Sequence, residues 1–257
     1  MERIATGPVA AASPHLPDGP RGGAAPAPAD LLDGMPRQRG AAEAAAAATR
    51  WVPLPWVRPW RLLPTPTGTP FTFAYTAVLA ATSLFAALAD PSVVHALYQA
   101  SSTDVAHLVR WPALVLPASA LWIAGGIVSP FAAGFLLVLT ALERRIGGAR
   151  AACVFLAGHV LATLATEVPV GLAVLFGHLP ATSLHRLDYG ISFGVAAGTG
   201  ALAGLLRPWL RWPLLILVGG ALLNDLIAFQ DPMTDWGHLI ALSIGVAGWP
   251  LVRRWQR

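Results

Sequence analysis

Two side chains in the C-terminal half of the chain have the types needed for nucleophilic catalysis. Ser192 lies in the segment Tyr189-Gly190-Ile191-Ser192-Phe193-Gly194, and His238 follows Asp235-Trp236-Gly237. A serine hydroxyl becomes a nucleophile when a nearby base accepts its proton, and imidazole is the commonest such base. Ser192 and His238 are therefore the candidate nucleophile and base, provided that the fold brings them together.

A second polar group recurs within one apolar stretch. His159, Thr163 and Glu167 are spaced four residues apart, so on a helix they share one face. Such a stripe suits a proton relay or a cavity lining, and it equally suits a structural seam hydrogen-bonded to Asn224 and Asp225. We favour the structural seam. A metal ion held by one His and one Glu would lack further ligands.

The amino-acid composition indicates that these groups are positioned by membrane-embedded helices. Of the 257 residues, 55% are hydrophobic and only 12% are charged, which is about half the charged fraction of a soluble domain. The seventeen basic residues are all arginine. Cys153 is the single cysteine, so there is no disulfide framework and no thiolate metal site. We expect an integral membrane protein with no nucleic-acid partner.

Six apolar stretches are each about long enough to cross roughly 30 Å of hydrocarbon as a helix. The predicted spans are Phe71–Ala89, Ala118–Leu142, Ala151–Val174, Ile191–Leu206, Pro213–Phe229 and Trp236–Val252. The fourth and sixth are short and rich in Gly and Ala, as expected for helices packed inside a bundle. The predicted fold is an all-α, polytopic bundle of six transmembrane helices.

The arginines predict the orientation of this bundle. Ten of them lie close to one set of span ends: two just before span one (Arg58 and Arg61), three between spans two and three, two between spans four and five, and three at the C-terminus. The opposite loops hold only Arg110 and Arg186. The positive-inside rule therefore predicts a multi-pass protein of the cell membrane with both termini cytoplasmic.

The N-terminal segment differs in composition from the rest. Residues 1–64 are rich in Ala, Pro and Gly, have no apolar period, and end in a juxtamembrane stretch that mixes Trp with Arg. Such a segment cannot bury enough apolar surface to fold, so we predict a disordered cytoplasmic tail. Residues 65–257 form the predicted membrane domain.

The predicted topology places the two candidate catalytic groups at one depth. Spans four and six both run inward, and Ser192 and His238 each lie about two residues, or roughly 3 Å, inside the outer end. His238, Ala241 and Gly245 share one helix face, and small residues let two helix backbones approach closely. A close approach is what a hydrogen bond between serine and histidine requires.

In these features the chain resembles the rhomboid family of intramembrane serine proteases. That family has a six-helix core, a serine at the top of helix four in a Gly-x-Ser-Gly motif, and a histidine that opens helix six. Gly190-Ile191-Ser192 and His238 with Ala241 and Gly245 match this pattern, and Thr140–Gly147 resembles the segment that closes helix two. The resemblance covers roughly residues 70–255 and implies a Ser192–His238 dyad.

The chain departs from the family pattern in the groups that would bind an oxyanion. Phe193 stands between Ser192 and Gly194, whereas the family's second glycine follows the serine directly. The family's His and Asn on helix two correspond to about Ile127 and Phe131, which have no side-chain donor. Losing one such donor typically costs about 10²–10³ in rate. The candidate substitutes near the site are Gly190, Gly194 and Ser129.

Three hypotheses follow. The first is a serine protease that cleaves transmembrane protein substrates with Ser192 and His238, admitting them beside the membrane-immersed segment Val105–Trp111. The second is a non-catalytic rhomboid-like protein that binds membrane helices or other partners. The third, transport along the His159–Thr163–Glu167 stripe, lacks the inverted repeat common in transporters. None of the three requires a cofactor or a resident metal.

Overall fold

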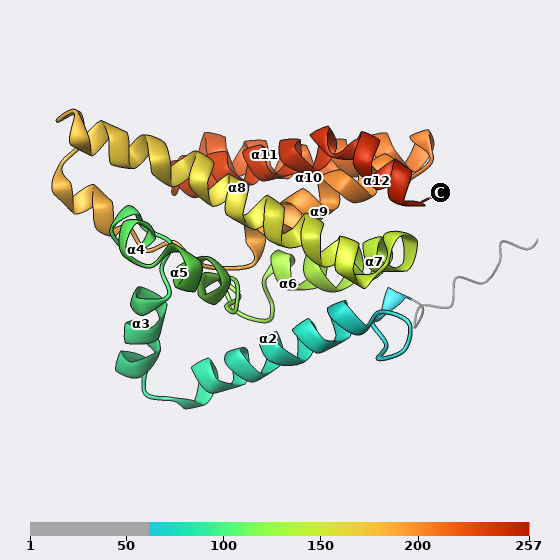
Figure 1. Cartoon of the computed structure of the whole chain (residues 1–257), viewed down its shortest axis with the longest axis horizontal. Coiled ribbons are helices and arrows are strands. Elements are labelled where there is room, and N and C mark those ends of the chain that lie inside the picture. Colours follow the sequence, from blue (N-terminus) through green and yellow to red (C-terminus); the bar gives the residue numbers. More distant parts are fainter. Residues whose placement is uncertain (1–61, 257) are drawn as a thin grey trace, which may run out of the picture. The chain divides into compact units, whose positions relative to one another are not determined.

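The computed structural model describes residues 62–256, and the regular structure within them is entirely helical (Figure 1). The helices before the central bundle are α2 (Pro70–Leu88), α3 (Pro91–Ala100), α4 (Val105–Arg110) and α5 (Pro112–Ser119). They are followed by α6 (Pro130–Gly134), the π-helical segment η3 (Phe135–Leu139), α7 (Thr140–Ile146) and α8 (Gly148–Leu175). The last are the 3₁₀ turn η4 (Ala181–His185), α9 (Ser192–Leu205), α10 (Pro208–Ala228), α11 (Pro232–Ala247) and α12 (Trp249–Gln256).

Three of these helices are long and apolar enough to cross a membrane. They are α2 with 19 residues, α8 with 28 and α10 with 21. Helix α9, with 14 residues, is a shorter apolar helix. The predicted tail, residues 1–64, lies almost wholly outside the described residues, so its disorder stays a prediction.

The second predicted span differs most from the structure. Instead of one helix over Ala118–Leu142, α5 ends at Ser119, and residues 120–129 form irregular backbone. Gly125 and Gly126 in this segment adopt positive φ, which glycine tolerates best. The helix restarts at Pro130, because proline suits a first turn and not a helix interior. Apolar composition alone did not reveal this break.

The centre of the protein consists of α8, α9 and α11, which lie side by side (Figure 1). Every residue of α9 from Ser192 to Gly204 is buried. A helix that is apolar all round needs neighbours on every side. Helix α9 meets this requirement with α8, α11, η3 and α12 packed around it.

Glycines set the spacing of this central group. A side chain at Gly245 of α11 would overlap the carbonyl oxygen of Ala197 on α9, and one at Gly200 of α9 would overlap that of Leu242. On the other side of α9, Gly158 of α8 lies directly against Ala197. The small residues therefore allow backbone-to-backbone contact, as the sequence predicted.

A buried carboxylate fastens α2 to α7. Glu143 accepts hydrogen bonds from the backbone N–H groups of Phe71 and Thr72 at 2.9 and 2.7 Å, and from the Thr72 hydroxyl at 2.6 Å. A negative charge at a helix N-terminus is favourable because it satisfies free N–H groups and suits the helix dipole. Gly147, with φ of 86°, then ends α7.

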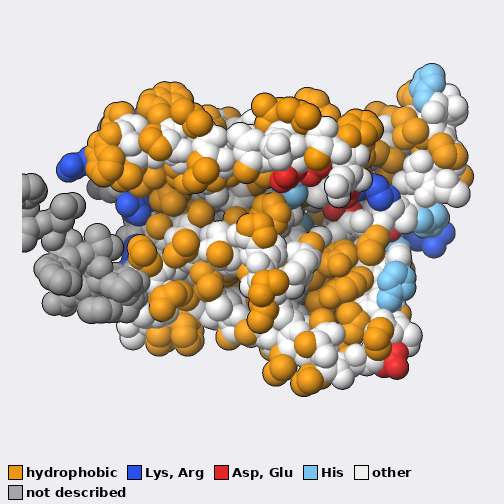
Figure 2. All heavy atoms as spheres, turned by 180° about the vertical axis from the view of Figure 1, so that it is seen from behind, with side chains coloured by type: hydrophobic (Ala, Val, Ile, Leu, Met, Phe, Trp, Pro, Cys, Tyr) orange, Lys and Arg blue, Asp and Glu red, His pale blue; other side chains and the backbone are white. Residues whose placement is uncertain are grey.

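The surface fits the membrane environment suggested by the helices. Figure 2 shows one face on which hydrophobic side chains cover most of the area. Arginines lie at both ends of this face, while most of the histidines lie toward one end and acidic groups lie near the middle and toward that same end (Figure 2). Large apolar residues such as Leu88, Ile216, Leu217 and Ile227 are exposed, which is expected of helices that contact lipid.

The contact between α9 and α11 makes a direct prediction about stability. We expect Gly245→Ala to lower the free energy of unfolding by about 1–3 kcal/mol, the usual cost of overpacking, because the added methyl group overlaps Ala197. Gly220→Ala on α10 is the matched control, since an added Cβ there meets nothing within 4 Å. Thermal unfolding in one detergent compares the two variants, and equal melting temperatures would contradict this packing.

Candidate functional site

Ser192 is the first residue of α9, and a fixed turn precedes it. Gly190 has a φ of 125°, and its N–H donates to the carbonyl oxygen of Ser119 at 2.9 Å. The N–H of Ile191 donates to the carbonyl oxygen of Trp122 at 3.1 Å. The backbone just before Ser192 is thus tied to the segment that follows α5.

His238 lies in the second turn of α11 and is held between two aromatic rings. Its imidazole stacks on Phe131 with ring centres 4.8 Å apart, and it meets Phe193 edge-on at 5.3 Å. Its Nδ1 atom is 4.0 Å from the Asp235 carboxylate, beyond hydrogen-bond reach. Its Nε2 atom is buried and has no hydrogen-bond partner in the described part of the chain.

Ser192 and His238 line the same cavity. This cavity has a volume of about 290 Å³, and Ser129, Asp188, Asp231 and Thr234 supply most of its other polar walls. Both side chains are more than nine-tenths buried. Among residues 62–256, no hydrogen bond joins the serine hydroxyl to the imidazole. Hydrogen bonds of this kind often tighten only when a substrate is bound.

The three candidate oxyanion residues have different surroundings. Ser129 lines the cavity, where its Oγ also accepts from the N–H of Phe131 at 3.3 Å as the N-cap of α6. The N–H group of Gly190 already donates a hydrogen bond to the carbonyl oxygen of Ser119, so it is not available to an oxyanion. Gly194 serves packing, because a side chain there would overlap the ring of Phe155.

The first turn of α9, which begins at the cavity with Ser192, has further N–H donors. Its N–H groups, beginning at Ser192, have no partner within the helix, as at any helix start.

The resemblance to the rhomboid family had singled out Phe131 only because its side chain lacks a hydrogen-bond donor. In the structure Phe131 covers one face of the candidate base. Nothing in the sequence around Phe131 indicated that its ring would stack on His238.

The polar stripe of α8 finds its partners outside α10. His159 Nε2 lies 3.0 Å from Ser119 Oγ and 3.1 Å from the carbonyl oxygen of Leu116. Thr163 is fully buried, and its hydroxyl has no partner among residues 62–256. Glu167 pairs with Arg186 at 2.6 Å.

The predicted partners of this stripe, Asn224 and Asp225, are not the observed ones. Both are exposed near the end of α10, and no hydrogen bond within the described residues links either to α8. The reason is that α10 packs on α11 and α9, whereas the polar face of α8 turns toward α5 and the loop before α9. The sequence gave no means of choosing between these neighbours.

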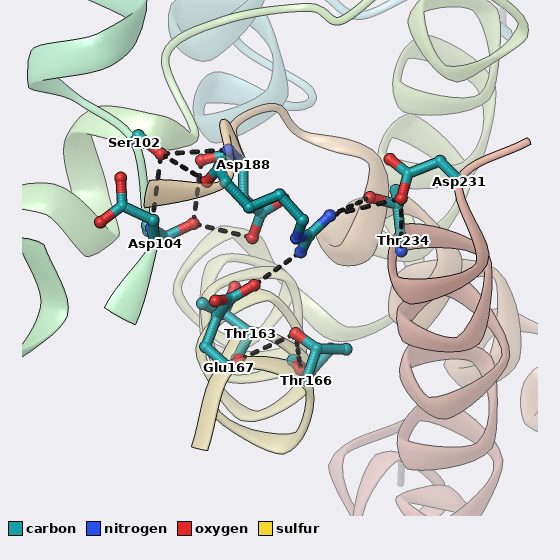
Figure 3. Close-up of polar contacts among 11 residues, drawn as sticks. Ser102, Asp104, Thr163, Thr166, Glu167, Asp188, Asp231 and Thr234 are labelled. Atoms are coloured by element: carbon teal, nitrogen blue, oxygen red, sulfur yellow. Dashed lines mark hydrogen bonds and ion pairs between the residues drawn. The ribbon is translucent and has the colours of Figure 1, made fainter. Parts of the chain in front are cut away.

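Arg186 joins α8 to the start of α11. Its Nη2 donates to Glu167, while its Nη1 donates to Thr234 Oγ1 at 3.0 Å and to Asp231 Oδ1 at 3.4 Å (Figure 3). Asp231 is also the N-cap of α11. Because Asp231 and Thr234 line the cavity, Arg186 fixes part of the cavity wall.

The loop that carries Arg186 is itself held by the segment between α3 and α4. Asp188 donates its N–H to Ser102 Oγ at 3.0 Å and accepts from the Thr103 hydroxyl at 3.0 Å (Figure 3). Burial raises the pKa of Asp188 above its ordinary value, although the nearby positive charge of Arg186 opposes this shift. Asp188 does not cap α9; it anchors the loop.

No metal centre is formed in the described part of the chain. Residues 62–256 contain no group of three or more His, Cys, Asp or Glu side chains placed to hold a metal ion. His159 and Glu167 have separate partners, as described above. The arrangement that remains is a hydroxyl and an imidazole in one small cavity.

Comparison with known proteins supports the resemblance seen in the sequence. Residues 67–257 match the model of a family described as rhomboid-like protein, which confirms the predicted kinship over most of the chain. No curated protein and no solved structure matches the chain.

The Arg186 network predicts a coupled loss of stability. Arg186→Gln leaves the carboxylate of Glu167 buried without its cation, and breaking a buried pair in this way typically costs about 3–5 kcal/mol. We expect a lower melting temperature in detergent, partly restored by the double change Arg186→Gln/Glu167→Gln. Arg110→Gln removes an exposed arginine of α4 and is the control. A double variant no more stable than Arg186→Gln would contradict the coupling.

Proposed function

The chain belongs to the rhomboid-like family of membrane proteins, and on this premise we propose that it is an intramembrane serine protease that cleaves transmembrane proteins. Ser192 is the nucleophile and His238 is the general base. The observation that carries this proposal is that both buried side chains line one cavity, while the Nε2 atom of His238 has no hydrogen-bond partner among residues 62–256.

In the proposed topology the chain crosses the bilayer six times. The crossings are α2, the continuous segment α6–η3–α7, α8, α9, α10, and α11 with α12. The excess of arginine in the α7–α8 connection, the α9–α10 connection and the C-terminus supports cytoplasmic placement of these ends in the cell membrane. The Ser192–His238 cavity then opens near the extracytoplasmic surface.

The proposed reaction is a two-step acyl transfer. As Ser192 Oγ bonds to the scissile carbonyl carbon, its proton passes to His238 Nε2. When the C–N bond breaks, His238 gives that proton to the departing amine, leaving an acyl ester on Ser192. Water then attacks the ester carbon, its proton passes to His238, and the ester bond breaks as Ser192 regains the proton.

The surroundings of the dyad suit this chemistry. The face of Phe131 lies against the imidazole, and an aromatic face stabilises the imidazolium that forms when His238 takes a proton. The free N–H groups at the start of α9 and the hydroxyl of Ser129 are the donors available to the developing oxyanion. They replace the side-chain donors missing at Ile127 and Phe131.

Covalent labelling tests this function. We expect a fluorophosphonate probe to label the full-length protein in detergent, and expect both Ser192→Ala and His238→Ala to lower labelling by at least about 10³-fold, because the dyad members act as a unit. Ser243→Ala is the matched control, since Ser243 is exposed on α11 and bonds only to its own helix. An unlabelled native protein, or labelling that persists in Ser192→Ala, would exclude the protease.

A second candidate is a non-catalytic protein that binds membrane helices. The specific observation in its favour is that no hydrogen bond joins Ser192 to His238 in the described residues, while Phe131 occupies a helix-two position that carries a donor in the family. Under this alternative, photo-cross-linking to transmembrane partners is equal in the native protein and in Ser192→Ala. Loss of partner capture in that single variant would argue against it.

A further inference from the structure

A basic groove lies at the opposite end of α9 from Ser192. Three arginines line it: Arg207 and Arg211 at the start of α10, and Arg253 on α12. Leu205, Leu206 and Gly204 form its floor, and its volume is about 610 Å³. This groove is far along the helix from the candidate catalytic site and plays no part in the proposed reaction.

Two of the three guanidinium groups are held in place. Arg211 donates through Nε to the carbonyl oxygen of Ala203 at 2.9 Å and through Nη2 to those of Gly204 and Leu206 at 3.3 and 2.9 Å. Arg253 donates through Nε to the carbonyl oxygen of Gly204 at 3.0 Å. These bonds satisfy the last carbonyl groups of α9, which have no partner within the helix.

An indole ring fixes the same two groups from the side. The guanidinium carbons of Arg211 and Arg253 lie 5.0 and 5.1 Å from the ring centre of Trp249. Trp249 in turn donates its Nε1–H to the carbonyl oxygen of Gly200 at 2.8 Å. Because a guanidinium has five N–H donors, the Nη1 group of Arg211 and both terminal nitrogens of Arg253 still have donors to offer.

Within residues 62–256, no acidic side chain neutralises the positive charge of the groove. No acidic side chain lines it, and within residues 62–256 none of its three arginines forms an ion pair. The N-terminus of α10, at Pro208, adds the positive end of a helix dipole. Three fixed or nearby cations with free donors form a site for an anion with several oxygen atoms.

Helix α10, whose N-terminus lies at the groove, also has an exposed apolar face, on a different side of the helix from Arg207 and Arg211. Trp209, Trp212 and Ile216 of α10 are all exposed and recur at spacings of three and four, so they share one face of the helix. Tryptophan at this position is typical of the headgroup layer of a membrane. These residues indicate that the end of α10 at the groove lies in the headgroup layer, where anionic headgroups are available.

We propose that this groove binds the phosphate of an anionic phospholipid. The phosphate oxygens accept hydrogen bonds from Arg207, Arg211 and Arg253, and the acyl chains extend from the groove into the bilayer beside the bundle. Arginine suits this role because its planar donors match phosphate oxygens in pairs. Basic pockets between membrane helices bind anionic headgroups through the same chemistry. The bound lipid would link α9, α10 and α12 at this end of the bundle.

Native mass spectrometry of the full-length protein in detergent tests the site. With phosphatidylglycerol added, we expect one molecule to be retained, and expect Arg207→Gln to weaken its retention about fivefold, the effect of one basic residue near an anionic headgroup. Arg207 makes only backbone hydrogen bonds within residues 62–256, and its side chain makes none, so this change leaves the packing intact. Arg253→Gln should weaken retention at least as much.

Matched controls distinguish binding in this groove from nonspecific attraction between exposed arginines and an anionic lipid. Arg254 is the neighbour of Arg253 on α12, is exposed, and does not line the groove, so Arg254→Gln should retain phosphatidylglycerol like the native protein. Equal losses in Arg253→Gln and Arg254→Gln would overturn the proposal. Equal retention of zwitterionic phosphatidylcholine would also overturn it. Displacement of the lipid by millimolar inorganic phosphate would assign the groove to free phosphate instead.

Discussion

The close contact between α9 and α11 is the constraint on which the candidate site depends. Gly245 meets the carbonyl oxygen of Ala197, and Gly200 meets that of Leu242, so the two backbones touch along the middle of the bundle. Helices whose axes are this close carry the residues at their N-terminal ends toward one another. Ser192, at the start of α9, and His238, in the second turn of α11, both line the cavity at this end of the bundle, where the ring of Phe193 also meets His238.

Charged and polar groups then fix the ends of the bundle. Glu143 holds the first turn of α2, Arg186 joins α8 to the start of α11, and Arg211 with Arg253 covers the last carbonyl groups of α9. In an apolar environment an unsatisfied backbone group is costly, so helix ends need such partners more than they do in water. Each of these side chains is held in turn by the group it contacts. Glu143 is held by the N-terminus of α2, Arg186 by the carboxylate of Glu167, and Arg211 and Arg253 by carbonyl oxygens of α9.

Much of the fold followed from the sequence, and the reasons are specific. The apolar runs predicted α2, α8 and α10 because length and hydropathy decide whether a helix can cross a membrane. The same measure missed the break at Gly125 and Gly126, where backbone conformation and not apolarity ends the helix. Small residues at spacings of three and four correctly indicated the faces of α9 and α11 that pack together.

The surroundings of the site could be predicted only in part. Ser192 and His238 were identified by residue type and by their positions near predicted helix starts. The predicted start of span six at Trp236 was four residues late, because α11 begins at Pro232. The partner of Glu167 could not be predicted, because it depends on how the helices are rotated and arranged in the bundle. The polar face of α8 turns toward Arg186 and not toward Asn224 and Asp225. Phe131 was identified as a position without a donor, but its stacking on His238 depends on the path of the loop before α6.

The measurement that tests the central claim most directly is the proximity of the two helix starts in the membrane. In a Cys153→Ser background, the pair Ser192→Cys/His238→Cys should form a disulfide under mild oxidation, because the two side chains face one cavity and a disulfide needs Cα atoms within about 7 Å. The pair Ser192→Cys/Ser243→Cys, with its second thiol on the exposed side of α11, should not. Failure of the first pair, or equal cross-linking of both, would contradict the account.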